Sequence, residues 1–584
     1  MTTSRQESPQ GAAATPASGV PQGTLIPLFV GLMLAMLLAA LNQTVFATAL
    51  PTIVGELNGV SSMVWVITAY ILATTIAIPI YGKLGDQIGR RPLLIAAILL
   101  FMAGSVVGGL ANDMGVLILA RVIQGVGGGG LMILSQAAIA DVVPARERGK
   151  YMGVMGGVFA LSSVVGPLLG GWFTDGPGWR WTFWINLPIG ALAVLAAIFY
   201  LKLPRYNQGR PRLDWGGMVL VTVATTALVL VTTWGGGTYA WTDPVILGLI
   251  GVFVLSSAAF VLVEMRAAEP LIPMSLFRER NFVLTTVAGL FIGVAMFGAL
   301  GYMPTYLQMS FGLDATVAGL AMIPMMGAML LTSTVSGGLV SKYGRYKWYP
   351  VTGAVVIAGS LVLLSIMSPD QPLWLACTYM GLLGLGLGLS MQNLVLIVQN
   401  TFPITMVGTA TASNNYFRQI GATLGSSLVG SLFATRLANL MAGRLPAEGA
   451  GQLGSAESLT PAAVSQLPDP LHEVVVTAYS DALTPIFLWI APLGVAAAVL
   501  LMFVHEKPLS TRIERSIEAE PLATGSLTIV SEHPRRASAS VEHSGAPMTA
   551  PSTAAAISAA TPAEPGEQAS PDATDRTIGV TSRS

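Results

Sequence analysis

The chain has 584 residues, of which 53% are hydrophobic and only 10% are charged, and its mean hydropathy is +0.68. Soluble domains carry about 25% charged residues, so this balance excludes a string of soluble domains and indicates a polytopic membrane protein. The formal net charge of +0 argues against nucleic acid as a partner. The single cysteine, Cys377, excludes a disulfide framework or a thiolate metal site within one chain, and we expect no cofactor.

Apolar runs recur along most of the chain. Residues 1–24 are polar, and the run that follows is too long for the hydrophobic region of a secretory signal peptide, so it predicts a first membrane helix. A span needs about 20 apolar residues. By this criterion we predict fourteen membrane helices, at 25–49, 62–81, 92–111, 114–137, 151–173, 180–201, 215–233, 244–264, 282–309, 314–340, 348–367, 373–399, 408–435 and 483–505.

Lysine and arginine concentrate in alternate loops. The loops after the second, fourth, sixth, eighth and tenth predicted spans carry them, whereas the intervening loops hold almost none apart from Arg180 and Arg444. Because positive loops stay on the cytoplasmic side, we expect a multi-pass protein of the cytoplasmic membrane with both termini in the cytoplasm. Two segments look unlike membrane helices: residues 441–482, expected to form an outer loop, and residues 509–584, expected to form a disordered tail.

A stretch between the second and third predicted spans recurs later in the chain. Residues 82–92 read GKLGDQIGRRP and residues 337–347 read GGLVSKYGRYK; their glycines align, and Asp86 faces Ser341. Each stretch follows the second helix of a six-helix set if the seventh and eighth spans are an insertion. This predicts a cytoplasmic N-terminal tail (1–24), a six-helix bundle (25–201), a linker with two extra helices (202–281), a second bundle (282–508) and the tail (509–584). Parallel repeats of this kind are typical of transporters, with the substrate site between the repeats.

Residues 82–92 resemble the signature loop of the major facilitator superfamily. Further stretches resemble motifs of its fourteen-helix drug:proton antiporters, of the multidrug efflux type: residues 41–53, 121–127, 162–171, 179–190 and 302–308. The resemblance covers roughly residues 25–507. It implies an all-α major facilitator fold of two six-helix bundles plus two inserted helices.

The repeated stretch is the candidate gate. Glycines let helices approach closely, an acid can accept hydrogen bonds from a helix N-terminus, and arginines can bridge to the facing bundle. The resemblance implies a latch that holds the cytoplasmic side shut in the outward-facing state; the alternative is a positive loop that only sets topology. The candidate gating residues are Gly82, Gly85, Asp86, Gly89, Arg90, Arg91, Gly344 and Arg345. Since Ser341 replaces the acid in the second copy, we expect the acid-dependent latch in the N-terminal half only.

A second motif lies in the fifth predicted span, where glycines flank a proline that interrupts backbone hydrogen bonding. Its residues are Gly166, Pro167, Gly170 and Gly171. The resemblance implies an antiporter-type helix that closes a leak path, and the alternative is ordinary packing of small residues.

Two arginines fall well inside predicted spans, Arg121 and Arg418, and ionisable residues at membrane depth are functional candidates. Other polar residues in the spans could contact substrate in a central cavity or merely bond between helices. These cavity candidates are Asn42, Gln43, Tyr70, Gln124, Tyr306, Gln308, Gln392, Asn393, Asn414 and Asn415. Arg121 and Arg418 are candidates for coupling or for the charge of the cavity.

We find no acid well inside any predicted span, and Asn42 stands where these antiporters usually have one. Asparagine cannot titrate, so the sequence does not identify a proton-coupling residue. Buried arginines without buried acids favour neutral, amphipathic or anionic substrates over dications.

The sequence therefore predicts a secondary active transporter that exports hydrophobic or amphipathic small molecules by alternating access, driven by proton influx, with the lipid bilayer around it and a monomer as the working unit. One alternative is an exporter of an endogenous metabolite such as an antibiotic, siderophore or lipid. Another is a membrane sensor with a transporter fold. A membrane enzyme is disfavoured because none of the four histidines falls well inside a predicted span; His505 is the last residue of the span 483–505.

Overall fold

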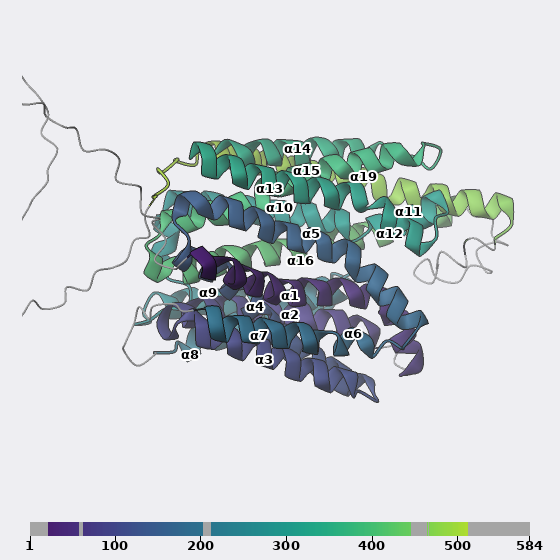
Figure 1. The fold of residues 1–584 in the computed structure, drawn as a ribbon. Helices are drawn as coiled ribbons and strands as arrows, with labels where there is room; N and C mark the ends of the chain where they lie inside the picture. Colours follow the sequence, from purple (N-terminus) through teal and green to yellow (C-terminus); the bar gives the residue numbers. More distant parts are fainter. Residues whose placement is uncertain are drawn as a thin grey trace, which may run out of the picture. The chain divides into compact units, whose positions relative to one another are not determined.

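The computed structural model describes residues 22–57, 62–201, 212–236, 238–444, 464 and 467–511. The chain divides into two units, Met1–Ser516 and Ile517–Ser584, and every described residue belongs to the first. Most of the two predicted tails therefore lies outside the described residues. The described part is a bundle of long helices that lie side by side (Figure 1).

The helices form two six-helix sets and an inserted hairpin. The first set is α1 (Gln22–Glu56), α2 (Met63–Ile88), α3 (Arg90–Gly109), α4 (Met114–Val142), α5 (Ala145–Asp175) and the broken helix α6 (Trp181–Trp184) with α7 (Asn186–Tyr200). The inserted helices are α8 (Trp215–Trp234) and α9 (Pro244–Glu264). After the short helix η2 (Met274–Arg278), the second set is α10 (Arg280–Leu300) with α11 (Met303–Phe311), α12 (Ala315–Ala321) with α13 (Ile323–Tyr343), α14 (Trp348–Ser365), α15 (Leu373–Thr401), η3 (Ile404–Met406) with α16 (Val407–Arg444), and α19 (Asp469–Met502).

Prolines explain two of the breaks. Pro304 and Pro324 lie in the first turns of α11 and α13. Proline has no backbone N–H to donate to the preceding turn, but it fits the first turn of a new helix. The chain can therefore bend at these points without leaving helical donors unpaired.

Thirteen candidate spans in the described part are long and apolar enough to cross a membrane. They follow the order of the predicted spans, and α16 supplies the remaining one although it is too polar to be counted by composition. With 38 residues, α16 is about 57 Å long and exceeds the apolar thickness of a bilayer, which is about 30 Å. The expected outer loop 441–482 is helical at 441–444 and from Asp469 onward. The side chains of Arg444 and Asp481 join these two helices in an ion pair of 2.7 Å.

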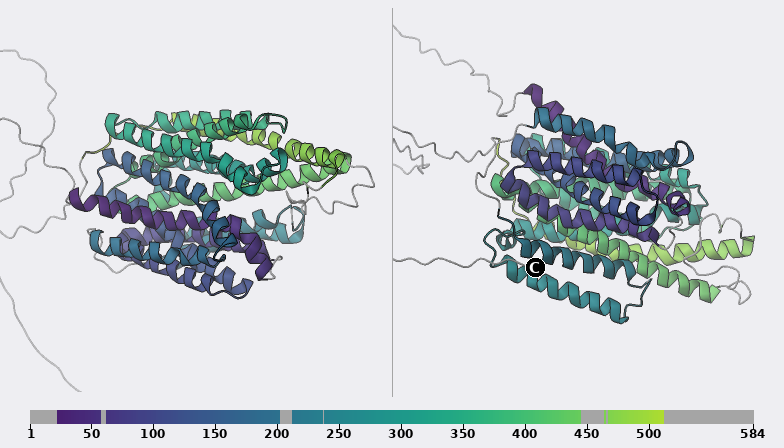
Figure 2. Two further views of the ribbon diagram at one scale, coloured as in Figure 1. Left: turned by 45° about the vertical axis from the view of Figure 1, so that its right-hand side comes forward. Right: turned by 90° about the horizontal axis from the view of Figure 1, so that it is seen from below.

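Each six-helix set has a hydrophobic core drawn mainly from its own helices. The inserted hairpin of α8 and α9 lies at the edge of the bundle (Figure 2). Helix α8 packs against α2 and α16, whereas α9 packs mainly against α8. Most of α9 is exposed and apolar, as expected of a helix that faces lipid.

Candidate gate and central polar residues

The repeated stretch is less of a loop than the sequence indicates. Its residues Gly82 to Ile88 form the last turns of α2, and α3 begins at Arg90. Only Gly89 turns the chain, with φ of 98°, a value that residues with a side chain rarely adopt. The side chains of Asp86 and Arg90 therefore project from rigid helix ends.

Asp86 caps a helix of the opposite set. Its carboxylate accepts hydrogen bonds from the backbone N–H of Gly408 at 3.1 Å, from the N–H of Thr409 at 2.7 Å and from the Thr409 hydroxyl at 2.8 Å. These donors belong to the first turn of α16, where backbone N–H groups lack partners within the helix. A negative charge is also favoured there by the helix dipole. Asp86 thus joins α2 to α16 through charge-assisted hydrogen bonds.

Arg90 is buried between two carboxylates. It forms an ion pair with Asp86 at 3.0 Å and a second one with Asp141, in the last turn of α4. It also donates to the carbonyl oxygens of Ala137 at 2.5 Å and Ile404 at 3.4 Å. Asp141 is itself buried. Asp141 was not among the predicted site residues because it lies just beyond the predicted span 114–137, where acids are usually solvated.

The glycines of both copies bring helices into backbone contact. A Cβ at Gly82 would lie 2.9 Å from the carbonyl oxygen of Gly408, and a Cβ at Gly337 would overlap the carbonyl oxygen of Gly149. Gly149 lies in the first turns of α5, as Gly408 does in α16. The matching positions of Gly149 and Gly408 are visible in the sequence: in residues 144–149 and in residues 403–408, a proline is followed after four residues by a glycine.

The second copy makes the matching contact without an acid. The Ser341 hydroxyl accepts a hydrogen bond from the backbone N–H of Lys150 at 3.2 Å, the counterpart of the bond from Thr409 to Asp86. Arg146 reinforces it by donating to the carbonyl oxygens of Ser341 at 3.2 Å and Lys342 at 3.1 Å. The pairing of Asp86 with Ser341 in the repeat therefore has a structural equivalent.

Other predicted gating residues have local roles. Arg91 donates to the carbonyl oxygen of Ile198 at 2.7 Å, within its own set. Gly85 packs against Leu134, and Gly344 ends α13 with φ of 73°. Arg345 is exposed and makes no hydrogen bond or ion pair with the described residues.

The hydrogen bonds that join the two sets in the described part of the chain all lie at the end that contains Asp86, which we call the closed end. The bonds farthest from this end run from Asn415 to the Gln136 side chain, at 3.1 Å, and from the Ser333 hydroxyl to the carbonyl oxygen of Gly153, at 3.1 Å. Each lies about 12 Å along its helix from the closed end of α16 or α5. Toward the opposite end, no further hydrogen bond between the sets is found among the described residues.

Arg121 lies inside the first set, fully enclosed. It donates to the Asn42 side chain, to the Gln124 side chain at 2.9 Å and to the carbonyl oxygen of Val66 at 3.1 Å. Its guanidinium also lies 4.2 Å from the ring centres of both Phe46 and Tyr70. Oxygen acceptors and aromatic faces, rather than a carboxylate, therefore stabilise this cation.

The remaining cavity candidates fall into two groups. Most are buried among helices in this structure, so they do not line a cavity in it: Asn42, Tyr70, Gln124, Tyr306, Asn393, Asn414 and Asn415. The Tyr306 hydroxyl, for example, lies 3.1 Å from that of Ser480, and Asn414 donates to Thr286 at 3.1 Å. The partly exposed members are Gln43, Gln308, Gln392 and Arg418.

The glycines of the α5 motif face α1. A Cβ at Gly166 would overlap Thr44, and one at Gly170 would lie 2.5 Å from the carbonyl oxygen of Val45. The Thr44 hydroxyl donates to the carbonyl oxygen of Ser162 at 2.8 Å. Gly171 has open space beside it. The motif thus brings α5 and α1 into close contact next to Pro167.

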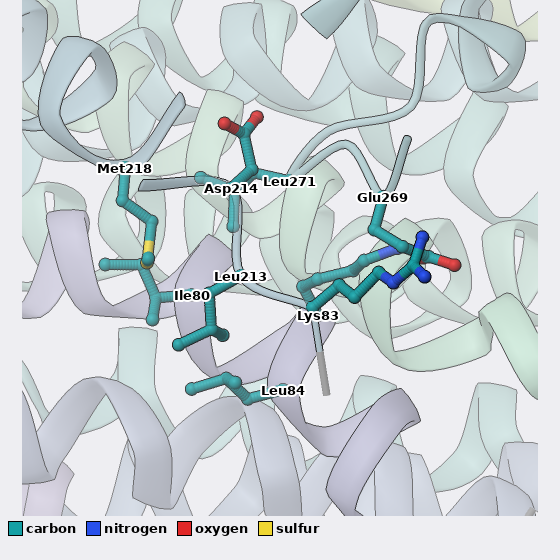
Figure 3. A pocket seen from close by; sticks show the side chains of 9 residues that line it. Ile80, Lys83, Leu84, Leu213, Asp214, Met218, Glu269 and Leu271 are labelled. Carbon is teal, nitrogen blue, oxygen red and sulfur yellow. The ribbon is translucent and has the colours of Figure 1, made fainter. Parts of the chain in front are cut away.

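A small pocket lies beside α2 at the closed end (Figure 3). Lys83 and Glu269 form an ion pair of 2.7 Å across it, and the hydrogen bond from Lys83 lowers the pKa of the Glu269 carboxyl below its ordinary value. Gln87 donates to the carbonyl oxygen of Arg212 at 3.2 Å. These contacts attach the segments that flank the inserted hairpin to α2.

The comparisons with known proteins agree with this architecture. The family model of the Major Facilitator Superfamily matches residues 32–426. An uncharacterized MFS-type transporter of Mycobacterium tuberculosis is 40% identical over 83% of this chain and 70% of its own length. A multidrug transporter protein of Bacillus subtilis is 36% identical over 83% of this chain and 94% of its own length.

Solved structures share the fold. A proton:xylose symporter of the major facilitator superfamily aligns with a TM-score of 0.54 at 16% identity, over 84% of this chain and 98% of its own. Together with the family match and the candidate spans, these relatives identify a multi-pass membrane protein. The chain belongs to the major facilitator superfamily, and its relatives include bacterial proteins named as multidrug transporters.

Proposed function

We propose that the protein exports hydrophobic or amphipathic small molecules by alternating access between its two six-helix sets, driven by proton influx. The observation that carries the proposal is the one-sided set of hydrogen bonds between the sets, centred on Asp86 and the first turn of α16. A transporter in its outward-facing state needs such a closure on the cytoplasmic side. Lys83, Arg90 and Arg146 lie at this end, which supports its assignment to the cytoplasm.

The closure has the properties of a reversible latch. It consists of hydrogen bonds, close glycine contacts and a limited number of apolar residues of the second set that pack against the core of the first. Such contacts can form and break as two rigid bundles rock. Names of relatives such as "Multidrug resistance protein 3" of Bacillus subtilis, 33% identical over 84% of this chain, support a drug-like substrate range.

We propose Asp141 as the group through which protons act. It is buried in α4 and shares Arg90 with Asp86, so protonation of Asp141 would remove one of the two negative charges that hold Arg90 in place. Arg90 and Asp86 would then rearrange, and the latch on α16 would weaken. Asp141 would thus be the group that gains and loses a proton, which Asn42 cannot do.

The proposal is tested by flux in proteoliposomes of the purified chain, with and without an imposed pH gradient, across cationic, neutral and anionic compounds. We expect the gradient to accelerate flux, and Asp141→Asn to abolish that acceleration. The control is Asp113→Asn, because Asp113 caps α4 at the opposite end within a single set, at 2.9 Å from the N–H of Val116. Flux that does not depend on the pH gradient would indicate a passive facilitator. Absence of flux for every compound would favour a membrane sensor with a transporter fold.

A further inference from the structure

Arg418 lies where the two sets separate. It is one turn beyond Asn415 on α16, and Asn415 makes one of the last hydrogen bonds from the closed end, to Gln136 of α4. Eleven residues separate Arg418 from the start of α16, a rise of about 16 Å. Arg418 is partly exposed, unlike its neighbours Asn414 and Asn415. Arg418 therefore keeps an accessible surface just beyond the last hydrogen bonds between the sets.

The opposite flank of the closure ends at the same level. There, Ser333 bonds to Gly153, and the Gln392 side chain lies beside Gly156 of α5, with Nε2 3.2 Å from the place of a Cβ. Gln392 is partly exposed, and its Oε1 has no hydrogen-bond partner. Partly exposed polar groups thus lie on both flanks at the level where the hydrogen bonds between the sets end.

The chemistry of Arg418 differs from that of Arg121. A guanidinium carries five N–H donors. Arg121 uses its donors on three oxygen acceptors and lies between two aromatic rings. Arg418 donates to the Asn415 side chain, and no carboxylate of the described residues forms an ion pair with it. Arg418 therefore has a charge without a counterion and donors that remain available to a ligand.

We propose that Arg418 binds the anionic group, such as a carboxylate, of an amphipathic substrate between the two sets, at the level where their hydrogen bonds end. A planar guanidinium matches a carboxylate in a two-point hydrogen bond, which fixes orientation as well as charge. The inference rests on the proposed transport function and narrows its substrates to compounds with one anionic end. The apolar part of the substrate would then extend away from the closed end.

Binding of a matched probe pair tests the proposal. Dansylglycine and its methyl ester differ in one carboxylate, and dansyl fluorescence or anisotropy reports binding to the purified full chain. We expect the wild type to bind the acid at least roughly tenfold more tightly than the ester. Arg418→Gln should lower the affinity for the acid roughly 10- to 100-fold and change the affinity for the ester less than about threefold. Arg418→Lys, which keeps the charge, should fall between them. Arg278→Gln, which removes an exposed charge from the short helix η2, is the control.

The binding and flux measurements test the anion site and the transport function separately. Equal binding of acid and ester by the wild type, absence of acid binding, or an unchanged acid affinity in Arg418→Gln would overturn the anion site. The wild-type ratio decides the question even if Arg418→Gln does not fold. Selective binding of the acid without flux of any compound in proteoliposomes would instead refute the transport function and leave the anion site in place.

Discussion

Neutralising Asp86 should open the closed end. In Asp86→Asn the side chain keeps one acceptor oxygen but loses its charge, and its NH₂ group faces donors from Thr409. The change removes the charge-assisted part of three hydrogen bonds between the sets and the favourable interaction with the α16 dipole. These contributions overlap, and together they are worth about 2–4 kcal/mol. The ratio of closed to open molecules should therefore fall roughly 30- to 900-fold.

The assay measures a distance across the closed end. Tyr200 in the first set and Tyr343 in the second are exposed near that end, so cysteines placed there can carry spin labels or a fluorescent pair. The chain's own Cys377 is first replaced by alanine. We expect a single short distance in the labelled wild type and a second, longer distance in Asp86→Asn, together with slower flux.

Asp113→Asn provides the matched control, because it removes the same charge from a helix cap that does not join the two sets. The control should leave the distance distribution unchanged. If Asp86→Asn also keeps the wild-type distribution and wild-type flux, the latch interpretation is wrong and the contact with α16 has only a packing role.

Three further predictions concern other contacts. Gly337→Ala should open the closed end and slow flux, because the new Cβ would overlap the Gly149 carbonyl oxygen. Gly338→Ala should have no effect, because that position has open space beside it. The same distances between labels are measured in both variants, and equal behaviour of the two would contradict the prediction. Arg121→Lys should lower the thermal unfolding temperature, because lysine cannot reach Asn42, Gln124 and Val66 together. The expected loss in the free energy of unfolding is about 3 kcal/mol. Arg345→Lys, at an exposed position, is the control. Hydrogen bonds from Arg180 and Trp179 lower the pKa of Glu56 from 4.5, so the ionised form contributes stability above about pH 4.5 and loses it as the pH falls through the lowered pKa. Glu56→Gln should therefore be slightly less stable than wild type at pH 7, by less than about 1 kcal/mol for so exposed a pair. A difference in stability that does not shrink as the pH is lowered stepwise from 4.5 would refute this account.

Some of the site could be predicted because its signals are local. The glycine spacing of residues 82–92 and 337–347 requires no partner to be recognised, and the structure uses both copies for close helix contacts. Proline positions likewise indicate where helices can break, as at Pro304 and Pro324. The length of a weakly apolar run predicts the span at 408–435; α16 begins one residue earlier, at Val407, and ends nine residues later, at Arg444.

Other features had no local signal. The acceptor role of Asp86 toward Gly408 and Thr409 joins residues more than 300 positions apart, and the burial of Asp141 depends on Arg90 reaching it from another helix. The candidate cavity residues all read alike in sequence, as polar groups in apolar runs. Only packing separates the enclosed Arg121 from the partly exposed Arg418.

The sequence by itself determined the membrane character, the order of the spans and the duplication, because burial in lipid demands long apolar runs and each copy carries its own glycine pattern. The tertiary structure alone decided which end is closed, which helix Asp86 caps and which arginine keeps free donors. These depend on how two bundles pack against each other, and the free energy of such contacts comes from atoms that are distant in the chain and adjacent only after folding.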